Sequence, residues 1–272
     1  MSAGGWQARL TLDFAQGANG RTILAKRSHQ GPLVVQRPFY PEGSPCHCYL
    51  LHPPGGVVGG DDLALHLTVG PTAHALLTTP GATKFYRSAG PLAQQQQWLH
   101  VAENGILEWL PQENIFFSGT HARLVTRFAL ASHARVLGWE VHALGRPANQ
   151  EPLLEGSVDL LLDLQQQGRP LLQDRLRIYQ GQGLTGSSGL RGWPVTGTAF
   201  AIPAGPEELA AVRQLTLNAE GQWGATLLDD LLVVRCLTSF TEPLRQLFTT
   251  VWSLLRPRIL QRPACLPGIW KC

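Results

Sequence analysis

The chain has 272 residues, of which 44% are hydrophobic and 15% charged, and its formal net charge is +3. This length allows one large domain or two small ones, and the composition is that of a packed globular protein rather than a disordered one. Because the net charge is small and no basic run exceeds two residues, we do not expect nucleic acid as a partner.

The start of the chain and the spacing of its cysteines indicate the cellular compartment of the protein. No charged region followed by an apolar region comes after Met1, and the apolar runs elsewhere are short, so we expect neither a signal peptide nor a membrane span. The five cysteines are not spaced as a disulfide framework. The sequence therefore predicts a cytoplasmic protein in a reducing environment.

Residues 1–200 are mostly typical of β-strands. Short runs in which apolar and polar residues nearly alternate are separated by turns rich in Gly and Pro, as in an all-β body. These runs are Ala8–Phe14, Leu63–Val69, Arg123–Leu130, Val158–Leu164 and Leu171–Ile178.

The last part of the chain has helical features. Pro206, followed by two acids, is typical of a first helical turn, and Thr241 is a plausible N-cap of a second helix. In that second helix an apolar stripe recurs at helical spacing, and Pro257 is expected to end it. We favour packing of the stripe on the chain's own β body over contact with a partner. With no repeat and no linker, we expect a single domain over residues 1–272.

Motifs of common enzymes are missing or incomplete. The segment HPPGGVVGGDD at residues 52–62 lacks the Lys and Ser or Thr of a phosphate-binding loop. The spacing G-x-G-x-x-G occurs at residues 181–186, but the residues after it cannot begin a helix, so we expect a turn. Neither G-x-S-x-G nor H-E-x-x-H is present.

A cluster of thiols and imidazoles is formed by Cys46, His47, Cys48 and His52. It could hold a metal, and a metal-dependent enzyme built on it is one hypothesis. The spacing differs from that of zinc knuckles, and in a strand His47 would face away from both cysteines. We therefore favour the cysteines as small buried core residues.

Several longer motifs follow one another in a fixed order. They are GPLVVQRPFYPEG at residues 31–43, Cys46-His47, residues 52–62, TTPGATKFYRS at residues 78–88, LEWLPQE at residues 107–113 and LGRP at residues 144–147. This series closely resembles the urease accessory protein UreD family, called UreH in some organisms. The resemblance covers essentially the whole chain and is densest up to about residue 150. The ending departs from the family, with Pro-Gly-Ile-Trp at residues 267–270 in place of Pro-Arg-Ile-Trp.

The resemblance implies a non-enzymatic protein that acts with UreF and the GTPase UreG on apo-urease to deliver nickel to the urease active site. It also implies a mainly β fold, a β-helix-like stack of strands with two C-terminal α-helices, and a water-filled internal passage for nickel. No cofactor is bound permanently, and Ni²⁺ is only transient. The alternative is a pure adaptor between urease and UreF that makes no metal contact.

Three acids are candidates for this nickel route. Asp61 follows a rigid Pro-Pro and flexible Gly-Gly bend, and it either faces a channel or caps a turn. Glu140 and Asp174 lie in strand-like runs where a buried acid needs a partner, water or an ion. The family more often has Asp at the first of these two positions and Glu at the second. For Asp174 we favour a surface ion pair with Arg175 or Arg177.

Further candidates lie in the same motifs and in the predicted second helix. Ser88 and His47 are candidates for the same route, and Lys84 and Arg87 for contact with a protein partner or for bracing a turn. The stripe residues Leu244, Phe248 and Trp252 are the candidates for partner contact if the helix is offered outward. Glu108 and Glu113 flank an apolar segment, and we expect them to stabilise the fold.

Overall fold

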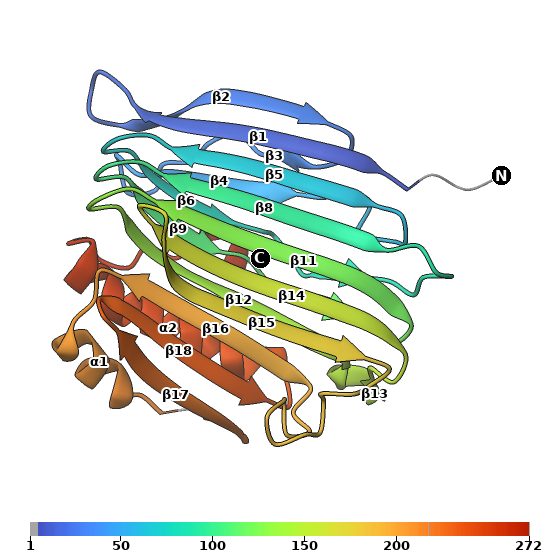
Figure 1. The fold of residues 1–272 in the computed structure, drawn as a ribbon. Coiled ribbons are helices and arrows are strands. Elements are labelled where there is room, and N and C mark those ends of the chain that lie inside the picture. Colours follow the sequence, from blue (N-terminus) through green and yellow to red (C-terminus); the bar gives the residue numbers. More distant parts are fainter. Residues whose placement is uncertain (1–4, 217, 272) are drawn as a thin grey trace.

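The computed structural model describes residues 5–216 and 218–271 and consists mainly of strands. Within these residues the strands form a seven-stranded sheet and an eleven-stranded sheet, which lie one behind the other (Figure 1). The seven-stranded sheet has the order β15-β14-β11-β8-β5-β1-β2. Its strands are β1 (Gln7–Gln16), β2 (Thr22–Gln30), β5 (Asp62–Val69), β8 (Ala93–Val101), β11 (Thr120–Leu130), β14 (Gly156–Gln166) and β15 (Arg169–Tyr179).

The eleven-stranded sheet has the main order β17-β18-β16-β12-β9-β6-β4-β3 over the described residues. These strands are β3 (Val34–Val35), β4 (Cys46–Leu51), β6 (His74–Thr78), β9 (Ile106–Leu110), β12 (Arg135–Arg146), β16 (Val195–Ile202), β17 (Gly221–Leu228) and β18 (Leu231–Thr238). Short side strands are β7 (Thr83–Phe85), β10 (Asn114–Phe116) and β13 (Glu151–Pro152), and 3₁₀ turns lie at Pro147–Asn149 and Gly268–Lys271.

Between β4 and β14 the chain alternates between the two sheets. Strands β1, β5, β8, β11 and β14 pair in parallel in one sheet, and β4, β6, β9 and β12 do so in the other. Each return adds one strand beside the previous one, which is the winding of a β-solenoid. This confirms the predicted β-helix-like stack.

The winding stops after β14, and the remaining strands pair antiparallel. Strand β15 returns along β14, and β16, β18 and β17 extend the other sheet beyond β12. The β17–β18 hairpin lies where the sequence suggested only helices, between the two that form. Its turn places Asp229 at φ 52°, a conformation that Asp tolerates better than most residues.

The two predicted helices are present as α1 (Pro206–Arg213) and α2 (Thr241–Ile259). The prediction that Pro257 ends the second helix was wrong, because α2 includes it and continues to Ile259. Proline removes one helical hydrogen bond, and α2 continues past it for only two residues.

Helix α2 packs on β12, β16 and β18, behind which it lies in Figure 1. Leu244 and Phe248 are fully buried and Trp252 is 2% exposed, so the apolar stripe contacts the chain's own sheet, as favoured. At Gly197 of β16, a Cβ atom would lie 2.8 Å from the Phe248 ring and 2.9 Å from Leu244, so glycine permits this close approach. For these three residues to contact a partner, α2 would have to leave the sheet.

Candidate functional site

Glu140 is a buried acid in the middle of β12. Its side chain is 6% exposed, and its Oε2 lies 3.5 Å from Nε2 of His142, two residues along the same face of the strand. Thr126 of the seven-stranded sheet donates a hydrogen bond to Glu140 Oε1, so the contact joins the two sheets. Within the described residues no arginine or lysine forms an ion pair with Glu140. Its negative charge is therefore not balanced by a permanent cation.

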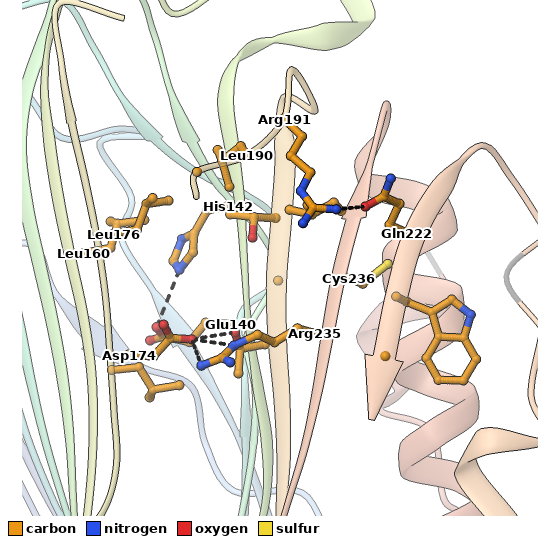
Figure 2. Close-up of a pocket in the computed structure, with 18 of the residues that line it drawn as sticks. Glu140, His142, Leu160, Asp174, Leu176, Leu190, Arg191, Gln222, Arg235 and Cys236 are labelled. Atoms are coloured by element: carbon orange, nitrogen blue, oxygen red, sulfur yellow. Dashed lines mark hydrogen bonds and ion pairs between the residues drawn. The ribbon is translucent and has the colours of Figure 1, made fainter. Parts of the chain in front are cut away.

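A cavity of about 610 Å³ lies beside Glu140 (Figure 2). Its wall includes His142 and the ion pair between Asp174 and Arg235, in which Nη2 and Oδ2 are 3.0 Å apart. Thr198 donates a second hydrogen bond to Asp174 over 3.2 Å. Asp174 is thus at the cavity, but its charge is balanced by Arg235.

The expected pairing of Asp174 with Arg175 or Arg177 was wrong. Both arginines pair instead with Asp159 on β14, at 2.6 Å and 3.5 Å. Consecutive residues of a strand face opposite sides of the sheet, so Arg175 and Arg177 lie on the outer face while Asp174 lies on the inner one.

An irregular loop over residues 180–194 forms one rim of this cavity. It contains the G-x-G-x-x-G spacing and is a turn, as predicted. A Cβ at Gly189 would lie 2.0 Å from the Gly183 carbonyl oxygen, so the two backbone segments touch. Arg191 donates to Oε1 of Gln222 on β17 over 3.1 Å, which ties the loop to the opposite rim.

A second cavity of about 220 Å³ also borders Glu140. Besides Glu140, the polar residues of its wall have neutral side chains. They include Thr79, Gln95, Gln97, Gln112, Asn114 and His52. Gln97 Oε1 lies 2.7 Å from the Thr126 hydroxyl that also contacts Glu140. Glu140 is therefore the carboxylate at which the two cavities adjoin.

Asp61 organises the loop at residues 52–62. Its Oδ1 accepts a hydrogen bond from the backbone N–H of Trp6 over 2.7 Å, and its Oδ2 accepts one from that of Val58 over 2.8 Å. The carboxylate is 1% exposed and joins the start of β1 to the loop. These contacts are those of a turn-capping acid, and a part in a nickel route stays a prediction.

The other candidates near this loop lie outside the two cavities as described. Ser88 donates to the Pro91 carbonyl over 2.6 Å and accepts from the Gly90 N–H over 3.2 Å, so it caps its own turn. Lys84 is exposed. Arg87 is exposed and lies 3.5 Å from Glu155, a surface pair of small energetic weight. Partner contact by Lys84 and Arg87 stays a prediction.

The thiol and imidazole cluster is divided between different parts of the fold. Cys46 and Cys48 are fully buried, with their sulfurs 3.8 Å apart. A hydrogen bond from the Cys48 thiol lowers the pKa of Cys46, and the same bond together with burial raises the pKa of Cys48. His47 points to the other face of β4, where its Nε2 lies 2.7 Å from Glu42. The favoured assignment of the cysteines to the core is confirmed.

His47 belongs to a buried ionic network that the sequence did not reveal. At its centre Arg256 of α2 contacts Glu108 on β9 at 2.9 Å and Glu42 at 2.5 Å. His74 Nε2 lies 2.7 Å from Glu108, and Trp252 Nε1 donates to the same carboxylate over 2.6 Å. Glu108 therefore stabilises the fold, as expected, by fixing α2 to the sheet.

The electrostatics of Glu108 follow from these partners. Burial by itself raises the pKa of a carboxyl group, but the hydrogen bonds and charges of His74 and Arg256 outweigh it and hold the pKa of Glu108 at about 2. The pKa of Glu42 is lowered as well, since His47 and Arg256 outweigh its burial. Both acids are charged at neutral pH.

Two further properties concern the described part of the chain, residues 5–216 and 218–271. No three side chains of His, Cys, Asp or Glu there converge closely enough to hold a metal ion. No helix in these residues has the length and apolar character needed to cross a membrane.

The family model described as UreD urease accessory protein matches residues 7–271. A urease accessory protein UreD of Pseudomonas putida (strain W619) is 48% identical over 266 residues, covering 98% of this chain and 94% of the relative. Those of Alcanivorax borkumensis and Citrobacter koseri are 46% and 43% identical, each covering 98% of this chain and 92% of the relative.

These matches define the class of protein as a urease accessory protein. The chain belongs to the UreD family.

Proposed function

We propose that this chain is a non-catalytic accessory protein that acts with UreF and the GTPase UreG on apo-urease, and that Ni²⁺ reaches urease through its interior. The observation that carries the interior route is that Glu140 borders both cavities. A cation that passed from one cavity to the other would meet this carboxylate on the way.

The chemistry of the two cavities fits a cation in transit. A buried carboxylate without a counter-ion is costly, and a divalent cation offsets that cost. Asp174 is already paired with Arg235, so Glu140 supplies the main free negative charge. The amides and hydroxyls of the second cavity are neutral oxygen donors, which bind Ni²⁺ weakly and release it readily compared with thiolates.

The accessory role is tested by co-expression of the urease subunits, UreF and UreG with and without this chain. We expect urease isolated without it to be poor in nickel and inactive in urea hydrolysis. Normal nickel content without the chain would contradict the accessory role.

The interior route is tested by Glu140→Gln, which preserves size and hydrogen bonding and removes the charge. The matched control is Glu103→Gln, an exposed acid whose partner is the surface residue His133. We expect Glu140→Gln to lower the nickel content of urease several-fold while the complex still assembles, and the control to leave it unchanged. A pure adaptor predicts full nickel content for both variants.

A further inference from the structure

His52 has a fixed place at the wall of the second cavity. It directly follows β4, and the Gly55 N–H donates to its carbonyl oxygen over 3.1 Å. Pro53 and Pro54 fix the next two φ angles. A Cβ at Gly56 would lie 2.2 Å from the Tyr86 ring, so the loop that follows His52 packs tightly against its neighbour and fixes the backbone here.

The imidazole of His52 has an unused nitrogen. Its Nε2 is buried and has no hydrogen-bond partner among the described residues, an arrangement that calls for water or a ligand. Burial lowers the pKa of His52, and the charge of nearby Asp61 offsets this only in part. The ring is therefore neutral at pH 7, which is the form that binds metals.

The other donor atoms of this cavity are oxygens, so the imidazole of His52 would add a different kind of metal ligand. The amide, hydroxyl and carboxylate oxygens of this cavity suit Mg²⁺ and Ca²⁺ at least as well as Ni²⁺, whereas imidazole suits Ni²⁺, Zn²⁺ and Cu²⁺. Glu140 attracts any divalent cation, but it does not distinguish Ni²⁺ from the hydrated Mg²⁺ that competes with it.

We propose that His52 is the specificity-determining residue of the interior route, with Nε2 as an exchangeable ligand that admits a borderline divalent cation such as Ni²⁺ in preference to Mg²⁺. This inference rests on the proposed function. One imidazole completed by water binds weakly enough for release toward Glu140.

The imidazole at the first cavity is less suited to this role. Nε2 of His142 lies 3.5 Å from Glu140, and its Nδ1 lies 3.4 Å from the Asn114 amide. Both nitrogens thus have neighbours within the chain. His52 differs because its Nε2 has none among the described residues.

The first test is direct observation of the imidazoles in the full chain labelled with ¹⁵N-histidine. Aqueous NiCl₂ is added in sub-stoichiometric amounts, and paramagnetic broadening is followed in ¹H–¹⁵N spectra. We expect the His52 ring signal to broaden at lower Ni²⁺ than the signals of the exposed residues His29 and His66. A large excess of MgCl₂ should leave both the signal and its broadening unchanged.

The second test is equilibrium dialysis of NiCl₂ in excess MgCl₂ with His52→Gln. We expect the variant to bind one Ni²⁺ at least about tenfold more weakly than the wild type, since even the loss of a residue that only hydrogen-bonds a metal ligand has an effect of this size. The matched control is His66→Gln, on the outer face of β5 where the ring stacks on Trp98 at 4.5 Å, and it should bind as the wild type does.

Two results would overturn the inference: a His52 signal that broadens no earlier than the exposed ones, or unchanged Ni²⁺ affinity of a folded His52→Gln variant. The wild-type spectra decide the question even if that variant does not fold. If His52 does not bind Ni²⁺ but urease still needs this chain for its nickel, the inference about His52 is wrong and the proposed function stands. Nickel binding at His52 with urease activated in the absence of the chain would instead reject the proposed function alone.

Discussion

The buried network around Glu108 allows a quantitative prediction for Glu108→Gln. Glutamine has the shape of glutamate but cannot carry the charge that balances Arg256. The pKa of Glu108 is held at about 2, against an ordinary value of 4.5. At about 1.4 kcal/mol for each pKa unit, this lowering corresponds to about 3 kcal/mol of folding free energy. We therefore expect Glu108→Gln to lower the free energy of unfolding by about 3 kcal/mol at pH 7, or roughly 6 °C in Tm.

The stabilisation by the Glu108 carboxylate depends on pH. A carboxylate whose pKa is lower in the folded than in the unfolded state stabilises the protein fully above the unfolded value. That contribution is lost as the pH falls from 4.5 toward the folded value of about 2. The wild type should therefore lose stability relative to Glu108→Gln over this window, and the two should converge at its acidic end.

The assay is urea denaturation at pH 7 and at several values between pH 5 and 3. The matched control is Asp229→Asn, which breaks the exposed pair with Arg169 at 3.2 Å and should change stability by less than about 0.5 kcal/mol. A loss below about 1 kcal/mol for Glu108→Gln at pH 7 would mean that the charge of Glu108 does not stabilise the fold. A difference in stability that stays constant between pH 5 and 3 would mean the same.

Two further substitutions test single hydrogen-bonding groups. Trp252→Phe keeps most of the packing of α2 but removes the N–H donated to Glu108, so we expect a loss of about 1–3 kcal/mol in urea denaturation; no loss would mean that the bond contributes nothing. Asp61→Ala removes the acceptor of the Trp6 and Val58 amides, so hydrogen exchange at both amides should accelerate at least tenfold, about 1.4 kcal/mol. Unchanged exchange at both would show that Asp61 does not hold the loop.

Much of the fold could be predicted because alternation of apolar and polar residues reports a half-buried strand directly. Ala8–Phe14 lies within β1, and Val158–Leu164 within β14. The β17–β18 hairpin was missed although two adjacent acids separate its apolar runs. It lies between two segments with strong helix-start signals, and local patterns do not say where one element type gives way to another.

The candidate site could be predicted only in part from the sequence, for a similar reason. Glu140 and His142 share a face of β12 because they are two residues apart, and this parity was available in the sequence. The partner of Asp174 was not, since Arg235 comes 61 residues later and meets it only because β18 joins the sheet through β16. Nor could spacing show that His47 and His52 lie at different places.

The proposed interior route requires that a nickel ion can occupy the junction of the two cavities at Glu140. Anomalous diffraction at the nickel edge, from crystals of the full chain soaked in NiCl₂, would locate such an ion. We expect a nickel peak within coordination distance of the Glu140 carboxylate, and its loss in Glu140→Gln crystals. Peaks confined to surface histidines, with none in either cavity, would contradict the interior route.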